Sequence, residues 1–182
     1  MNKTKLPNLI TTLRIAGTAG LLFILPLTPQ YFVIYTLCGL SDALDGWLAR
    51  HTGTASDFGA KLDSIADLFF YTVMLLGLMP ILWRLLPGLF WALLGAVLLI
   101  RLCAYAVAAG RYGRFAALHT YMNKLTGAAV FLLPYILRLP FAPAYCWAVW
   151  AVAALASTEE LLLHAVGGEY NPNKKTIFKI EK

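Results

Sequence analysis

The segment SDALDGWLARHTGTASDFGAKLDSIADLFFY, residues 41–71, contains every aspartate of a 182-residue chain. The five are Asp42, Asp45, Asp57, Asp63 and Asp67, and the chain on either side of them is largely apolar. Hydrophobic residues make up 60% of the chain and charged residues only 13%, whereas a soluble domain carries about 25% charged residues. We therefore expect an integral membrane protein in which these acidic residues have a specific functional role.

Six apolar runs are long enough to cross a bilayer as helices, which takes about 20 mainly apolar residues. They cover approximately residues 6–27, 31–50, 57–85, 88–109, 119–137 and 143–166. Proline and glycine, which break helices, lie in the links between the runs. The sequence predicts an all-α fold, a bundle of six transmembrane helices that forms one domain over residues 1–182.

The net charge is +6, and the basic residues lie between the apolar runs rather than in one solvated stripe. This distribution argues against nucleic-acid binding and for the charge bias that orients membrane proteins. With six spans, one side carries only Arg84 and Arg138, and Arg101 lies within a span. The other side carries Lys3, Lys5, Arg14, Arg50, Lys61, Arg111, Arg114, Lys124, Lys174, Lys175, Lys179 and Lys182. We expect both termini on the cytoplasmic side of a bacterial plasma membrane.

The second and third spans meet in a short loop, which places four of the aspartates at similar depth. Asp42 and Asp45 lie three residues apart, and Asp63 and Asp67 lie four apart, so each pair shares one helical face. Asp57 precedes an apolar run and is typical of a helix N-cap. An acid within a membrane costs about 2.5–3.5 kcal/mol even on a lenient scale. A positive partner must therefore offset the four carboxylates.

Hard divalent cations bound by carboxylate oxygens are one such partner, and Mg²⁺ commonly combines carboxylates with substrate phosphates. The alternative is an ion pair between helices that involves Arg50 or Lys61. Such a pair explains one aspartate but not four. A cluster of this kind therefore favours a metal site.

Small residues lie among the acids. Gly46 and Gly59 fall within helical segments, where glycine is tolerated if a ligand or a neighbouring backbone comes close. Ala49 is interpreted in the same way, with close helix packing as the alternative for all three. Arg50 is able to hold a phosphate with two hydrogen bonds, or else it anchors the helix at the interface.

Together these residues give the pattern D-x2-D-G-x2-A-R-x8-G-x3-D-x3-D over residues 42–67. The pattern resembles the signature of the CDP-alcohol phosphatidyltransferases, and all eight fixed positions match. The resemblance implies an integral membrane enzyme, usually a homodimer, that transfers a substituted phosphate from a CDP-linked donor to an alcohol and releases CMP. The implied donor is CDP-diacylglycerol.

The resemblance also implies roles for individual residues. Asp42, Asp45 and Asp63 would hold two divalent cations, Mg²⁺ or Mn²⁺, which grip the donor diphosphate. Asp67 would also lie at the metal site and act as general base. The residues implied for the donor pocket are Gly46, Ala49 and Gly59 along the nucleotide and Arg50 on a phosphate.

Residues 7–14, PNLITTLR, resemble the opening of phosphatidylglycerophosphate synthases. Asn8, Thr11 and Arg14 recur every three residues and share a face, from which they are candidates to bind donor phosphate. The alternative is a polar helix start in which Arg14 extends its charged end to the interface.

Arg101 is a candidate for acceptor binding because an arginine within a membrane is usually functional. It resembles an arginine of phosphatidylglycerophosphate synthases, although the glutamate expected after it is Leu102 here. Arg111, Arg114 and Lys124 are further candidates to bind an acceptor that carries a phosphate, with membrane orientation as the alternative explanation. Glycerol 3-phosphate leads by a small margin.

The other acceptors and another class of function stay open. The segment LDSIAD, residues 62–67, looks closer to phosphatidylserine synthases, so serine and inositol phosphate remain alternatives. A small ion or metal transporter is the competing class, but it favours acids near the midplane and repeated halves. For Glu159 and Glu160, late in the sixth span, a hydrogen bond between helices is the favoured interpretation, and the alternative is that one of them faces the site and pairs with a basic residue.

Overall fold

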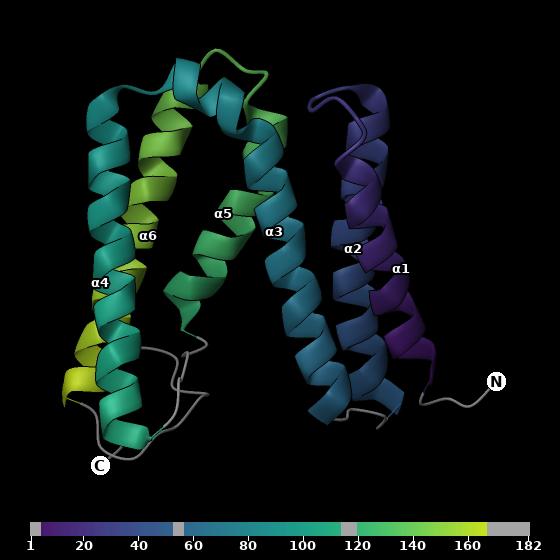
Figure 1. The fold of residues 1–182 in the computed structure, drawn as a ribbon, viewed down its shortest axis with the longest axis horizontal. Coiled ribbons are helices and arrows are strands. Elements are labelled where there is room, and N and C mark those ends of the chain that lie inside the picture. The colour runs from purple at the N-terminus through teal and green to yellow at the C-terminus, as the bar shows by residue number, and fades with distance from the viewer. Residues whose placement is uncertain (1–4, 53–56, 114–119, 167–182) are drawn as a thin grey trace. The chain divides into compact units, whose positions relative to one another are not determined.

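The computed structural model describes residues 5–52, 57–113 and 120–166, and these residues form six helices. The helices are labelled in Figure 1, and each overlaps one of the predicted runs. Their bounds are α1 Lys5–Leu21, α2 Pro29–Thr52, α3 Asp57–Leu85, α4 Gly88–Tyr112, α5 Tyr121–Ile136 and α6 Ala142–Val166. The predicted all-α class is confirmed.

The first helix is shorter than expected, because α1 ends at Leu21 and not near residue 27. After Leu21 the backbone continues in a tight turn, in which the amide of Phe23 donates to the carbonyl of Gly20 (3.1 Å). Pro26 has no amide hydrogen and disfavours a helical residue before it. Leu27 then adopts a left-handed conformation with φ 63°, and this reversal directs the chain into α2.

The chain divides into two compact units, Met1–Trp83 and Arg84–Lys182. In the first unit α1 packs along α2. Gly17 makes their close approach possible, since a Cβ atom at this position would lie 2.9 Å from Sγ of Cys38. The ring of Tyr35 in α2 stacks on the ring of Phe70 in α3, with centroids 4.9 Å apart. These contacts hold α1, α2 and α3 together, and α2 and α3 carry the aspartates.

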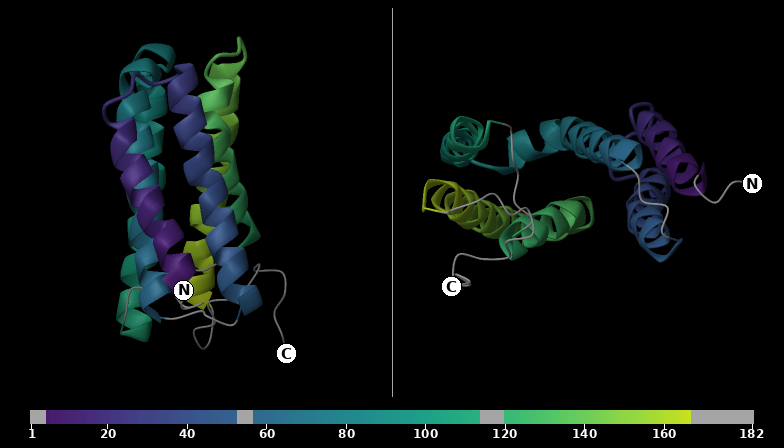
Figure 2. Two further views of the ribbon diagram at one scale, coloured as in Figure 1. Left: turned by 90° about the vertical axis from the view of Figure 1, so that its right-hand side faces the viewer. Right: turned by 90° about the horizontal axis from the view of Figure 1, so that it is seen from below.

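In the second unit α6 packs against both α4 and α5 (Figure 2). The hydroxyl of Tyr145 in α6 donates to the carbonyl of Ala129 in α5 at 2.7 Å. Phe90 of α4 meets Trp147 of α6 edge to face, with centroids 5.1 Å apart. Thr120 caps α5, because its hydroxyl accepts a hydrogen bond from the backbone amide of Asn123. α6 is thus the central helix of this unit.

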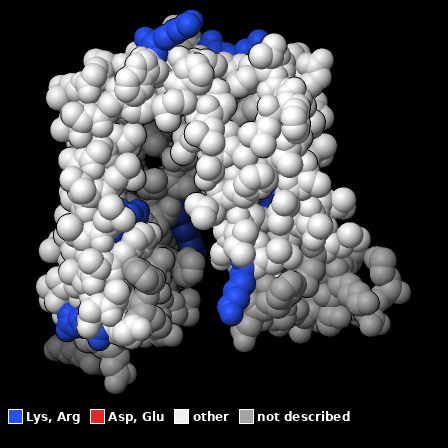
Figure 3. All heavy atoms as spheres, viewed as in Figure 1, with Lys and Arg blue, Asp and Glu red and all other residues white. Residues whose placement is uncertain are grey.

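Three of the helices contain stretches long and apolar enough to cross a membrane, namely Lys61–Leu85, Gly88–Tyr112 and Ala142–Val166. Among the described residues many large apolar side chains are exposed, Phe23 and Leu68 for example. Most of the face drawn in Figure 3 carries neither basic nor acidic side chains. These features are those of an integral membrane protein. The six spans and the single domain stay predictions.

Candidate metal and donor site

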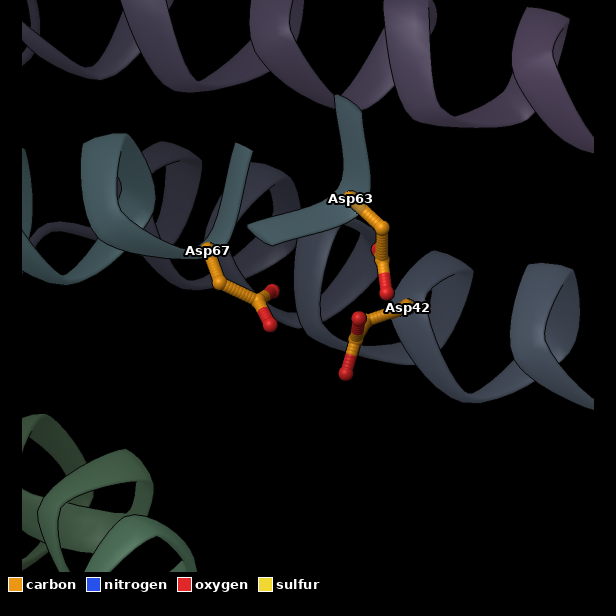
Figure 4. Close-up of side chains that lie close together, drawn as sticks. All are labelled: Asp42, Asp63 and Asp67. Carbon is orange, nitrogen blue, oxygen red and sulfur yellow. The ribbon is translucent and has the colours of Figure 1, made fainter. Parts of the chain in front are cut away.

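Three of the four clustered aspartates meet in the first unit. Asp42 comes from α2, while Asp63 and Asp67 lie one turn apart on α3. One carboxylate oxygen from each of the three lies within 4.8 Å of the others, and Figure 4 shows the three carboxyl groups pointing toward one another from the two helices. The prediction that the second and third spans bring their acids together is confirmed for these three.

Arg14 of α1 joins the three acids. Its Nη1 group donates to Oδ1 of Asp42 and to Oδ1 of Asp67, the latter at 3.1 Å. Its Nη2 group donates to Oδ1 of Asp63. The Arg14 side chain is only 1% exposed, whereas those of Asp42, Asp63 and Asp67 are 45%, 40% and 44% exposed. The guanidinium group therefore lies on the enclosed side of the cluster, and the carboxylates are open on another side.

The packing of α1 on α2 explains how Arg14 reaches the acids. Thr11, Arg14 and Gly17 follow one another at intervals of three residues and share a helical face. Thr11 and Arg14 are buried, and Gly17 lets α1 approach Cys38 of α2. The thiol of Cys38 also lies 3.8 Å from the backbone carbonyl of Arg14. This face of α1 is thus turned toward the acidic helices.

The sequence interpretation missed this partner. It considered Arg50 and Lys61 as counter-ions and expected an ion pair to account for one aspartate only. In the structure a single arginine contacts three carboxylates, and Lys61 is exposed. The three-residue spacing of Thr11 and Arg14 was the available signal, but spacing does not reveal which helix a face will meet.

For the remaining predicted site residues of this unit, the structure gives the position in the helix. Gly59 lies in the first turn of α3, and Asp57, expected as its N-cap, is its first residue. The positions whose side chains lie outside the description are Asn8 in α1, Asp57 in α3, and Asp45, Gly46, Ala49 and Arg50 in α2. Their roles stay predictions.

The three aspartates suit divalent cations such as Mg²⁺ or Mn²⁺. They offer only carboxylate oxygens, the hard ligands that these ions prefer. The oxygens lie close enough together to share an ion. Their partial exposure leaves room for phosphate or water ligands as well.

A second polar cluster lies in the other unit and joins α4, α5 and α6. Nη1 of Arg101 donates to Oε2 of Glu160, and Nη2 donates to Oδ1 of Asn123 at 2.9 Å. The amide of Asn123 in turn donates to Oε2 of Glu160 at 2.8 Å. Glu160 is fully buried. Glu160 therefore makes the expected hydrogen bond between helices, to Asn123, and also the alternative pairing with a basic residue, Arg101. The sequence interpretation gave Asn123 no role.

The other candidates for acceptor binding differ in their surroundings. Nη1 of Arg111 donates to the carbonyls of His164 (2.8 Å) and Ala165 (2.6 Å) at the end of α6. Lys124 is exposed near the start of α5, and Arg114 lies outside the described residues. Their binding to an acceptor stays a prediction.

Comparison with known proteins places the acid cluster in context. The family model for CDP-alcohol phosphatidyltransferase matches residues 4–159. The chain belongs to this family. The aspartates brought together by α2 and α3 are three of the four in the signature that first suggested the resemblance.

The relatives carry names for different acceptors. A CDP-diacylglycerol–glycerol-3-phosphate 3-phosphatidyltransferase from Pseudomonas fluorescens is 31% identical over 160 residues, which cover 83% of this chain and 79% of that protein. A CMP-forming cardiolipin synthase from Streptomyces coelicolor is 33% identical over 144 residues, or 74% of this chain and 63% of the relative.

A CDP-diacylglycerol–serine O-phosphatidyltransferase from Methanocaldococcus jannaschii is 52% identical, but over only 54 residues. This match covers 30% of the chain and a quarter of the length of that relative. No solved structure matches the chain.

Proposed function

We propose that this chain transfers a phosphatidyl group from CDP-diacylglycerol to an alcohol and releases CMP. The observation that carries the proposal is the meeting of Asp42, Asp63 and Asp67, whose carboxylate oxygens lie within 4.8 Å of one another. These residues occupy signature positions of the family to which the chain belongs. Their partial exposure makes them accessible to a diphosphate that arrives with cations.

The proposed metal ligands are Asp42, Asp45, Asp63 and Asp67, with two Mg²⁺ or Mn²⁺ ions. Such ions supply charge stabilisation for a diphosphate and align the reacting groups. Asp67 is the proposed general base, which takes the proton of the acceptor hydroxyl. As the acceptor oxygen bonds to the phosphorus that carries the diacylglycerol, the bond to the bridging oxygen breaks and CMP leaves.

The remaining assignments concern the donor. We assign Gly46, Ala49 and Gly59 to the nucleotide pocket, where the lack of large side chains allows close approach. The residues proposed to bind donor phosphate are Arg50, Asn8, Thr11 and Arg14. For Arg14 the support is its position beside the carboxylates.

Glycerol 3-phosphate is the proposed acceptor. It appears in the name of the relative whose match covers 83% of this chain. The acceptor residues proposed are Arg101, Arg111, Arg114 and Lys124. Serine and inositol phosphate are the alternatives.

The proposed setting is a bilayer crossed by six helices, in a homodimer, with termini and site at the cytoplasmic face of a bacterial plasma membrane. The excess of basic residues on one side supports this orientation. Cysteine labelling from each side of sealed vesicles, with reporters near the two termini, tests it. Labelling of the termini only from the outer side would contradict the orientation.

The test of function is CMP release by purified protein in mixed micelles that contain CDP-diacylglycerol. Glycerol 3-phosphate, serine and inositol phosphate are supplied separately, with Mg²⁺ or Mn²⁺. We expect release with glycerol 3-phosphate and none from Asp63→Asn, while Lys61→Gln, a change on the same helix, retains activity. Release with another acceptor alone would replace glycerol 3-phosphate, and no release with any acceptor would refute the activity.

A further inference from the structure

The surroundings of Arg14 are unusual for an arginine. The side chain is 1% exposed, and among the described residues its side-chain hydrogen bonds go to Asp42, Asp63 and Asp67 alone. Its Nε atom is buried and has no hydrogen-bond partner within the described part of the chain. An arginine has five N–H donors and is normally satisfied when buried. The guanidinium group is thus held in place mainly by its contacts with the three acids.

The oxygens that Arg14 contacts belong to the same three carboxylates that can hold a cation. Oδ1 of Asp42, Oδ1 of Asp63 and Oδ1 of Asp67 each accept a hydrogen bond from the guanidinium group. A divalent cation held by these carboxylates would be close to the positive charge of Arg14, and the two would repel each other. The cation and Arg14 therefore oppose one another at a shared set of ligands.

A diphosphate changes this balance. It brings negative charge next to the cluster, close enough to act on the positive charge of Arg14 without direct contact. With such an anion present, its negative charge offsets part of the combined positive charge of Arg14 and the cation. The repulsion between Arg14 and the cation then falls.

We propose that Arg14 is a built-in counter-ion of Asp42, Asp63 and Asp67 that weakens cation binding until a diphosphate is bound. Cation and donor then bind with positive coupling, and part of this coupling passes through Arg14. The inference rests on the proposed function, because it assumes that the three carboxylates bind divalent cations. It adds that the enzyme loads its cations tightly only together with the nucleotide.

The test measures Mn²⁺ binding to the full chain in detergent by electron paramagnetic resonance of free Mn²⁺, with and without CDP. Arg14→Met removes the charge and keeps an apolar chain of similar length. We expect Arg14→Met to bind Mn²⁺ about tenfold more tightly than the unaltered protein without CDP, equal to about 1.4 kcal/mol. We also expect the tightening of Mn²⁺ binding by CDP to shrink by a similar factor, since coupling is reciprocal.

Two control variants test whether the effect on Mn²⁺ binding is specific to the charge and shape of Arg14. Arg84→Met removes a positive charge from the same helix as Asp67 at a distance of roughly 25 Å along the axis, and it should leave both constants unchanged. Arg14→Lys keeps the charge but presents one ammonium to three carboxylates. It should bind Mn²⁺ two- to threefold more tightly than the unaltered protein, and it serves as the test if Arg14→Met does not fold.

The outcomes separate the inference from the proposed function. If the unaltered protein binds no Mn²⁺ with or without CDP, the metal site itself is refuted. If it binds Mn²⁺ and Asp63→Asn does not, the metal site stands. In that case equal or weaker Mn²⁺ binding by folded Arg14→Met, or by Arg14→Lys where Arg14→Met does not fold, overturns the counter-ion role.

Discussion

Replacing Glu160 by leucine should destabilise the second unit by about 3 kcal/mol. Glu160 is fully buried, while the side chain of its partner Arg101 is 22% exposed. Glu160→Leu removes the carboxylate that faces the guanidinium group. Among the described residues, Asn123 is then the remaining side-chain hydrogen-bond partner of Arg101. Breaking a buried ion pair costs about 3–5 kcal/mol, and the partial exposure of Arg101 places the expected value at the lower end.

The double variant Arg101→Met/Glu160→Leu isolates the charge effect. It removes both ions, and apolar replacements are well accommodated in a membrane protein, so we expect a cost of about 1 kcal/mol. The amide of Asn123 loses its hydrogen bond to Glu160 in both variants, which contributes about 0.6 kcal/mol by the average for hydrogen bonds within membranes. The double variant should thus be more stable than Glu160→Leu by about 2 kcal/mol.

The assay is reversible unfolding in mixed micelles with a rising fraction of denaturing detergent, followed by circular dichroism. Glu160→Gln is the matched variant, because it keeps the shape and a hydrogen-bond acceptor but loses the charge. It should fall between the unaltered protein and Glu160→Leu. A cost below about 0.5 kcal/mol for Glu160→Leu would refute the reasoning, as would a double variant less stable than Glu160→Leu.

Three further outcomes are expected. Asp67→Asn should lower kcat by a factor on the order of 10²–10⁴ while Mn²⁺ binding persists, and retained turnover would remove Asp67 as the base. Arg101→Ala should raise the KM for the acceptor more than the KM for CDP-diacylglycerol, whereas equal changes would contradict acceptor binding. Gly17→Ala should lower the free energy of unfolding by about 1 kcal/mol, since its new Cβ would lie 2.9 Å from Sγ of Cys38. Cys38→Ala should relieve that cost, and an additive loss in the double variant would count against the close contact.

Helix positions were predictable from the sequence because long apolar runs separated by proline and glycine have few other solutions in a bilayer. All six helices match. The clustering of Asp42 with Asp63 and Asp67 was also predictable, because a short link between two spans sets their depths and helical periodicity sets their faces. The early end of α1 was harder to foresee, since the apolar run continues through Leu22 and Phe23 into a turn.

The partners of the charged residues were not predictable in the same way. Arg14 meets acids that lie 28, 49 and 53 positions further along the chain. Arg101 meets Glu160 from 59 positions away. Such contacts depend on how each helix is rotated about its axis and on which neighbour it packs against. The spacing of residues within one helix predicts neither of these.

The contact of Arg111 with the end of α6 has a consequence for how variants of this residue are interpreted. Its guanidinium group donates hydrogen bonds to the carbonyls of His164 and Ala165, which have no partner within the helix itself. Arg111→Ala would fray the last turn of α6, and the disturbance would spread to Glu160 one and a half turns earlier. A raised KM for the acceptor in that variant would then reflect loosened packing at the end of α6 rather than the loss of a residue that binds the acceptor. Arg111→Lys, which still reaches one carbonyl, distinguishes the two origins by whether thermal stability and KM recover together.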